Sequence, residues 1–300
     1  MRQIMKWSRL ALLGLCLVAT ASANEANYQH YQVGDRAAGM GGGISAIADA
    51  MDACYYNPAG LMRTPNNTLS LSANLYGFQR YSVDDAFMPG ERFETDSFQS
   101  VPSTAGGVFK LNTNLVAAFS AFVPKKGSYY ETVVFPESEH YYILSLDYQS
   151  MWLGPSLAYQ VSPKLSLGAS LFGVYNSYNA QQSLFWGDYN QAYATGVKYN
   201  DLSALGVLGL QYRLDEYWSV GFTFQTPSAH LTSNGEWLED IVDSNDQEQK
   251  SEVFYANHLS ADNLTPAEFA LGIAREVPGV WAFGVDVLYH LATSYTRLSG

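Results

Sequence analysis

The side chains that most often carry chemistry are sparse in this sequence. None of its five histidines forms an i,i+4 pair of metal ligands or stands beside a nucleophile motif. A Ser/His/Asp set could form only through folding, and nothing in the sequence indicates which residues would join it. We therefore identify no catalytic residue and no metal ligand, and we predict a protein that is not an enzyme. The histidines are His30, His140, His230, His258 and His290.

A glycine-rich stretch at residues 34–43 suggests a phosphate-binding loop, but neither known fingerprint fits. No Gly-Lys-Ser/Thr follows, and Ile44 stands where G-x-G-x-x-G needs its last glycine. Small residues do let backbone pack closely in a confined space. We expect one short helix over 44–53, and we expect Pro58 to stop its continuation and force Asn57 out of helical geometry. The stretch is a candidate plug for a lumen.

Two groups of charged residues could bind a ligand. Lys125 and Lys126 could attract a carboxylate, although such residues are more often solvated loop charges. The segment 228–266 carries eight acidic residues and one basic residue, Lys250. It could bind divalent cations that bridge lipopolysaccharide, or it could simply be a solvated face. The acidic residues are Glu236, Glu239, Asp240, Asp243, Asp246, Glu248, Glu252 and Asp262.

Composition excludes several classes of protein. The 300 residues include 16 basic and 28 acidic side chains, a net charge of −12, which excludes the basic face that nucleic-acid binding needs. The 15 Phe, 22 Tyr and 6 Trp argue against disorder. Two cysteines exclude a disulfide framework or a thiolate zinc site, and no cofactor motif is present.

The first 23 residues have the three regions of a signal peptide. Arg2, Lys6 and Arg9 form a positive start, residues 10–20 form an apolar core, and residues 21–23 read Ala-Ser-Ala, a cleavage site. The apolar core is shorter than the ~20 residues of a membrane-spanning helix, and no other apolar stretch reaches that length. The sequence therefore predicts export and argues against a helical membrane protein.

After residue 65 the sequence alternates residue by residue, which is typical of β-strands. We expect nine strands, separated alternately by short and by long polar connections. The short connections are 111–114, 162–164, 214–217 and 277–279, and the long ones are 79–99, 125–141, 186–200 and 228–266.

This alternation of connections is typical of an outer-membrane barrel, which has tight periplasmic turns and long extracellular loops. Lipid cannot form hydrogen bonds, so a spanning sheet must close and turn its apolar side outward. Aromatic residues at the strand ends suit an interfacial girdle, although singly they also fit a soluble sandwich. The mean hydropathy of −0.10 then averages a lipid face and a polar lumen face. The sequence therefore predicts an all-β, transmembrane antiparallel β-barrel over residues 65–300, in a bacterial outer membrane.

Residues 34–42 read Gly-Asp-Arg-Ala-Ala-Gly-Met-Gly-Gly, and they precede Asp52 and an Asn-Pro-Ala-Gly-Leu run at 57–61. This pattern resembles the N-terminal hatch of FadL/TodX-type outer-membrane transporters, and residues 101–124 are similar to that family's second and third strands. The resemblance implies a fourteen-strand barrel with a hatch over 24–64, whose tip faces a kinked third strand. The implied hatch residues are Asn57, Pro58, Ala59 and Gly60 at the tip, and Gly34, Gly39, Gly41 and Gly42 in its backbone.

The resemblance also implies a function. Members carry long-chain fatty acids or, in some cases, aromatic hydrocarbons, from an extracellular apolar groove through a lumen pocket to a lateral exit into the membrane. No motif transfers the residues that bind the ligand. The expected partners are such a hydrophobic molecule and the outer-membrane lipid and lipopolysaccharide. The alternatives are a structural or secretion-partner barrel and, less favoured, a barrel hydrolase.

The expected strand count differs from that of the family. Bacterial barrels normally have an even number of strands, and an odd count such as nine leaves the chain end outside the cell. Residues 297–300 also lack the terminal aromatic strand that such barrels usually show. We therefore expect the chain to be a barrel that is incomplete at its C-terminal end.

Overall fold

A computed structural model describes residues 32–71, 74–84, 92–102, 104–135, 140–186, 191–245, 248–294 and 298–299. The expected signal peptide, residues 1–23, and the start of the expected hatch, residues 24–31, lie outside the described residues. Among the described residues, none belongs to a helix that is long and apolar enough to cross a membrane.

In the described part of the chain, three short helices precede the strands. They are α2 (Asp35–Gly39), α3 (Ala50–Tyr56) and the 3-10 helix η1 (Pro58–Arg63). The helix expected over 44–53 was placed too early, because Asp49 is extended and Ala50 has a φ of 48°, so α3 begins only there. The expected stop at Pro58 is confirmed: Asn57 is extended (φ −163°, ψ 98°) and begins η1.

The rest of the described chain is β-structure. The strands are β1 (Thr68–Leu71), β2 (Asn74–Asp84), β3 (Arg92–Pro102), β4 (Thr104–Lys110), β5 (Leu115–Phe135), β6 (His140–Ser162), β7 (Leu165–Trp186), β8 (Gln191–Arg213), β9 (Trp218–Gln225), β10 (Ala229–Asn245), β11 (Glu248–Ala261), β12 (Glu268–Val277), β13 (Trp281–His290) and β14 (Leu298–Ser299).

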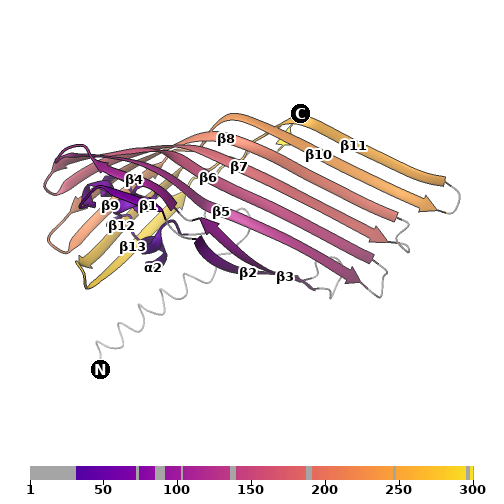
Figure 1. Ribbon diagram of the computed structural model, residues 1–300, viewed down its shortest axis with the longest axis horizontal. Coiled ribbons are helices and arrows are strands. Elements are labelled where there is room, and N and C mark those ends of the chain that lie inside the picture. The colour runs from indigo at the N-terminus through magenta and orange to yellow at the C-terminus, as the bar shows by residue number, and fades with distance from the viewer. Residues whose placement is uncertain are drawn as a thin grey trace, which may run out of the picture.

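These strands form one large antiparallel sheet and a separate hairpin, β2–β3 (Figure 1). From β1 the sheet runs through β4, β5, β6 and β7 to β8, where it divides. The first half of β8 pairs with β10, which continues to β11, and its second half pairs with β9, which continues to β12 and β13. Among the described residues β1 pairs only with β4 and β13 only with β12, so the described sheet is an open trough.

Four pairs of strand segments follow one another with only short breaks: β1–β2, β3–β4, β9–β10 and β11–β12. Counting each pair once, and leaving aside the two residues of β14, gives nine strands in the residues that the structure describes, the number expected from the sequence. The short connections are also where the sequence placed them. They join the strands of the hairpins β4–β5, β6–β7, β8–β9 and β12–β13.

The expected long loops are wrong. Most of 79–99 lies in β2 and β3. Most of 125–141, 186–200 and 228–266 lies in β5–β8, β10 and β11, whose far ends run out together to one side (Figure 1). The strand β6 alone has 23 residues, whereas about 10 residues of a strand cross a bilayer. Beyond the lipid both faces of a strand meet water, so the alternation of side chains disappears while the backbone hydrogen bonds continue.

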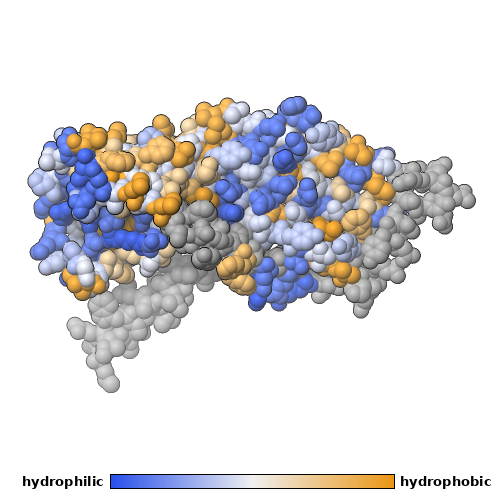
Figure 2. Space-filling view, in the orientation of Figure 1, coloured by the Kyte–Doolittle hydropathy of each residue, from blue (hydrophilic) through white to orange (hydrophobic). Residues whose placement is uncertain are grey.

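The outward face of the sheet carries continuous apolar rows. One row crosses six strand pairings in register and consists of Leu115, Tyr159, Leu167, Leu210, Phe222, Leu271 and Val287. Leu271 and Val287 are 61% and 66% exposed, which is costly in water but favourable against lipid. Figure 2 shows hydrophobic residues gathered over the part of the sheet near β4, β6 and β9, with a largely hydrophilic stretch over the middle of the long strands.

A charge in this row tests which part of the surface faces lipid. We expect Leu271→Arg to lower the free energy of unfolding in bilayers by about 2–4 kcal/mol, the cost of an arginine on the lipid face near the midplane. The matched control is Val253→Arg on β11, because Val253 is equally exposed at 62% but lies in the long extension. Urea unfolding in liposomes measures both, and equal losses would contradict the placement of the lipid band.

Candidate functional site

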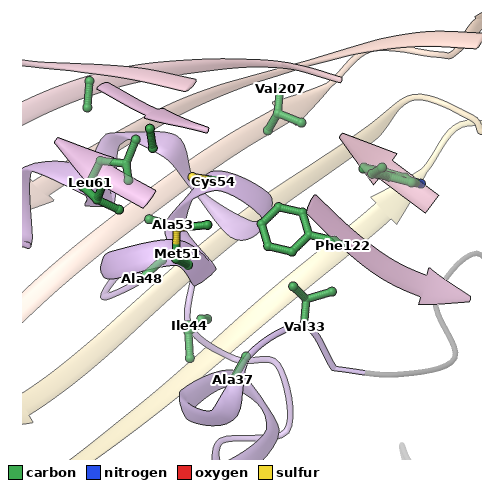
Figure 3. Packing of buried hydrophobic residues seen from close by; sticks show 14 of the residues in the cluster. Val33, Ala37, Ile44, Ala48, Met51, Ala53, Cys54, Leu61, Phe122 and Val207 are labelled. Carbon is green, nitrogen blue, oxygen red and sulfur yellow. The ribbon is translucent and has the colours of Figure 1, made fainter. Parts of the chain in front are cut away.

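Residues 32–64, which we name the N-terminal segment, pack against the inner side of the trough. α2 lies beside β12 and β13, and α3 and η1 contact β4–β8 (Figure 1). Figure 3 shows apolar side chains of the segment gathered near Phe122 and Val207 of the strands. The segment supplies much of the core, and its fully buried apolar residues include Ile44, Ile47, Ala53, Cys54 and Leu61.

The segment is seated on glycines of the inner face. Gly168 of β7 is in register with Gly209 of β8, and Gly221 of β9 is in register with Gly272 of β12. With Gly284 of β13 they make a diagonal line, which we name the glycine track. Since glycine has no Cβ, the backbone of another segment can approach the strands directly.

The distances show how close this approach is. A Cβ built on Gly209 would lie 2.1 Å from Asn57 Oδ1, and one on Gly168 would lie 2.3 Å from the backbone nitrogen of Ala59. A Cβ on Gly221 would lie 2.2 Å from the carbonyl oxygen of Ser45. Any larger residue at these positions would have to displace the segment.

Asn57 is the central polar contact between the segment and the sheet. Its side chain is completely buried. The Nδ2 group donates to the carbonyl oxygens of Ser45 at 2.8 Å and Leu210 at 3.0 Å, and Oδ1 accepts from the backbone N–H of Ala59 at 3.2 Å. Leu210 lies in β8, so one amide joins the two halves of the segment and the wall. The predicted tip residues Pro58, Ala59 and Gly60 are buried beside it.

Strand side chains also donate hydrogen bonds to three carbonyl groups of the segment. Ser170 donates to the carbonyl oxygen of Cys54 at 2.9 Å, and Thr223 donates to that of Tyr56 at 2.9 Å. Gln211 donates to the carbonyl oxygen of Ser45 at 3.1 Å. These contacts satisfy backbone groups that have no partner in a helix or strand.

Charged groups attach the segment at two further places. Asp286 of β13 accepts hydrogen bonds from the backbone N–H of Ser45 at 2.9 Å and from its hydroxyl at 2.6 Å. Near the short turns, Arg36 pairs with Glu276 at 2.6 Å, and Arg63 pairs with the same carboxylate. Arg36 also pairs with Asp49. These polar contacts can be replaced by hydrogen bonds to water, unlike the apolar contacts of the core beside them.

The four predicted backbone glycines differ from one another. Gly34, Gly41 and Gly42 have φ values of 87°, 63° and 85°, in the left-handed region that favours glycine, whereas Gly39 ends α2 in open space. Gly34 also lies against Asp52, since a Cβ there would be 1.8 Å from Oδ1. Burial raises the pKa of Asp52 to about 6, against the hydrogen bond from Ala37 that lowers it.

A cavity of about 370 Å³ lies between the segment and the strands. One wall is aromatic: Tyr55 packs on Trp152 with ring centroids 5.2 Å apart, and Tyr56 adjoins it. The other wall is polar and includes Glu268, whose carboxylate is 3.3 Å from His290 Nδ1. The cavity is therefore amphipathic, with two carboxylates, Glu268 and Asp286, in its lining.

Lys125 and Lys126 are not brought to this cavity. Both are half-buried in the extended part of β5, and the Lys125 ammonium lies 5.5 Å from the centre of the Tyr148 ring. They do not line the cavity.

The sequence reasoning identified the tip of the segment but missed the glycine track that receives it. One signal was available, because several glycines of the track lie on the small, polar face of the alternating strands. A glycine in a strand often marks a close backbone approach. Tyr55, Tyr56 and Trp152 were missed because a cavity wall assembled from two segments far apart in the sequence, α3 and β6, leaves no local pattern.

The glycine track can be tested with an alanine. We expect Gly209→Ala to destabilise the protein by about 1–3 kcal/mol, because an overpacked contact must shift, and to expose the segment to protease. The control is Gly173→Ala on β7. The nearest atom to the new Cβ there is 3.8 Å away, so we expect the protein to tolerate this substitution. Limited proteolysis and thermal unfolding in detergent measure both, and equal effects would contradict the track.

The buried carboxylate of Asp52 predicts a pH dependence. Its ordinary pKa is 3.8 and its folded pKa is about 6, so the folded protein favours the protonated form. The contribution of the protonated Asp52 side chain to the free energy of unfolding is complete below pH ~4 and is lost as the pH rises through 6. We expect the melting temperature of the wild type to fall over this window relative to that of Asp52→Asn. Parallel pH curves would show that Asp52 does not titrate in this way.

Comparison with known proteins agrees with the fold. The family model "Outer membrane protein transport protein (OMPP1/FadL/TodX)" matches residues 14–283, whereas comparison with curated proteins gives no match. The P. putida toluene transporter TodX aligns with a TM-score of 0.64 at 16% identity, covering 87% of this chain and 70% of that one.

Two further solved structures share the fold. The Ralstonia pickettii toluene transporter TbuX aligns with a TM-score of 0.61 at 16% identity, covering 84% of this chain and 70% of that one. A Pseudomonas aeruginosa FadL homologue aligns with a TM-score of 0.53 at 13% identity, covering 90% of this chain and 82% of that one. Since the family match covers most of the sequence, this chain belongs to the OMPP1/FadL/TodX family, whose members are bacterial outer-membrane transporters of hydrophobic compounds.

Proposed function

We propose that this protein takes up small hydrophobic molecules across the outer membrane, and that residues 24–64 act as a hatch inside a barrel wall formed by residues 65–300. The observation that carries the proposal is the cavity of about 370 Å³, one wall of which is the segment itself. A molecule in this cavity touches Tyr55 and Tyr56, so movement of the segment changes the site that holds it.

The lining of the cavity favours a particular class of ligand. The aromatic wall offers ring faces and edges to an apolar molecule. The carboxylates Glu268 and Asp286 on the other wall would repel a fatty-acid carboxylate. Among the hydrophobic compounds expected from the sequence, we therefore propose a neutral molecule such as a monoaromatic hydrocarbon in preference to a long-chain fatty acid. TodX and TbuX, named as toluene transporters, are consistent with this choice.

The contacts of the segment support a hatch that can move. Asn57, the tip expected from the resemblance, is attached by hydrogen bonds, and Ser45 is attached to Asp286 by two more. A net contribution of about 0.5–1.5 kcal/mol for each such bond lets a group of them open together without unfolding the sheet. We propose that the ligand passes when these contacts release, and that it then leaves towards the membrane.

A reversible tether tests the hatch. The side chains of Ser45 and Asp286 are in contact, with Oγ and Oδ2 2.6 Å apart, so we place cysteines at both positions to link the segment to β13 by oxidation. We expect cells carrying Ser45→Cys/Asp286→Cys to lose uptake of labelled toluene when oxidised and to regain it with a reductant. The single variants Ser45→Cys and Asp286→Cys are the matched controls and should not respond to oxidation.

The outcomes separate the parts of the proposal. Unchanged toluene and oleate uptake in cells without the protein would contradict transport itself. Uptake through the oxidised double variant would contradict hatch movement and leave transport intact. Loss of oleate uptake alone in cells without the protein would overturn the proposed ligand class and return the function to fatty-acid transport.

A further inference from the structure

A second group of side chains gathers at the point where the sheet divides. Asp201 of β8, His230 of β10 and Asp262, directly after β11, each place one ligand atom within 4.8 Å of the other two. His230 Nδ1 is 2.7 Å from Asp201 Oδ1. The sequence placed Asp262 only within an acidic segment and did not group it with Asp201 and His230, because these three residues are separated by 29 and 32 positions along the chain.

Hydrogen bonds fix the orientation of the Asp201 carboxylate, as is common for carboxylates that bind metals. It is completely buried, and its Oδ2 accepts hydrogen bonds from Asn176 at 3.1 Å and from Ser203 at 2.8 Å. These two donors fix the orientation of the carboxylate and leave Oδ1 turned toward His230. Second-shell hydrogen bonds of this kind orient metal-binding carboxylates.

The charge of the group also calls for a cation. With a neutral imidazole the three side chains carry two negative charges, one of them completely buried. Burying a charge is costly unless it is paired or coordinates a metal. The contacts with Asn176, Ser203 and His230 offset part of the buried charge of Asp201, and a cation would offset the charge of both carboxylates. Asp262 makes no hydrogen bond or ion pair with any residue that the structure describes, so its carboxylate is available to a ligand.

The backbone around the group is shaped to bring these residues together. The pairing of β10 with β8 shifts register between His230 and Thr232, a bulge that re-aims the side chain of His230. Asp262 is the first residue of the connection between β11 and β12. This connection is hydrogen-bonded to the one between β9 and β10: Ser228 N–H donates to the carbonyl oxygen of Thr265, and Thr265 N–H donates to Ser228 Oγ, both at 2.9 Å.

We propose that Asp201, His230 and Asp262 form a binding site for a divalent transition-metal ion such as Zn²⁺. One imidazole nitrogen and two carboxylate oxygens are ligands that Zn²⁺ accepts, and three protein ligands leave a position open to water. Mg²⁺ and Ca²⁺ prefer sites made of oxygen alone. The bound ion joins β8, β10 and the β11–β12 connection where the wall is interrupted, independently of the cavity and the segment.

Zinc titration of the full chain in detergent tests the site. We expect the wild type to bind one equivalent of Zn²⁺ by isothermal titration calorimetry in the presence of excess Mg²⁺. His230→Gln and Asp262→Asn should each lose this binding, and Asn176→Ala should weaken it by about 10- to 100-fold. The control is His258→Asn, which removes an exposed histidine of β11 and keeps a residue type that tolerates the φ of 56° there.

A second measurement covers the case in which a variant folds poorly. In the wild type, Zn²⁺ should slow amide hydrogen exchange at 226–228 and 262–267 and raise the melting temperature, with neither effect in Asp262→Asn. The proposal is overturned if the wild type binds no Zn²⁺ above the level of Asp262→Asn, or if His258→Asn loses binding as His230→Gln does.

Discussion

The direct contact of one backbone with another is the constraint on which this structure depends. Residues 43–59 lie so close to the strands that no Cβ fits between them at Gly168, Gly209 or Gly221. At that distance side chains of the wall can donate to carbonyl groups of the segment, and Ser170, Gln211 and Thr223 supply these donors. The position of the aromatic wall of the cavity follows, because Tyr55 and Tyr56 come directly before Asn57. One geometric condition therefore determines the core, the polar attachments and the cavity.

The two faces of the sheet have different roles: the outer face contacts lipid, and the inner face contacts the N-terminal segment. The outer face repeats apolar residues in register across the strands, which needs only side chains that lipid accepts. The inner face is irregular, with glycine, serine, threonine, glutamine and acidic residues, since it must match a folded segment and leave space for a ligand. The chemistry of the protein therefore lies on the face whose pattern is least regular.

The sequence predicted those parts of the fold that have a local cause. Pro58 ends α3 because its ring excludes a further helical turn, and nine strands follow from alternation over short runs. The start of α3 was misplaced because Asp49 is extended where it pairs with Arg36, a contact that local propensity does not encode. The long strand ends were read as loops because water on both faces removes the alternation. Asp201, His230 and Asp262 were not grouped because only the division of β8 between two partners brings them together.

The length of the strands has a consequence for where a molecule first meets the protein. If about 10 of the 23 residues of β6 cross the bilayer, the remainder runs roughly 40 Å along the tilted strand and rises roughly 30 Å above the bilayer. A wall of paired strands at that height is far stiffer than a set of loops, because its backbone is bonded on both sides. The extracellular entrance then lies above the lipid head groups and is held in place by a rigid wall. A scarce hydrophobic molecule can bind there directly from the surrounding water before it dissolves in the membrane.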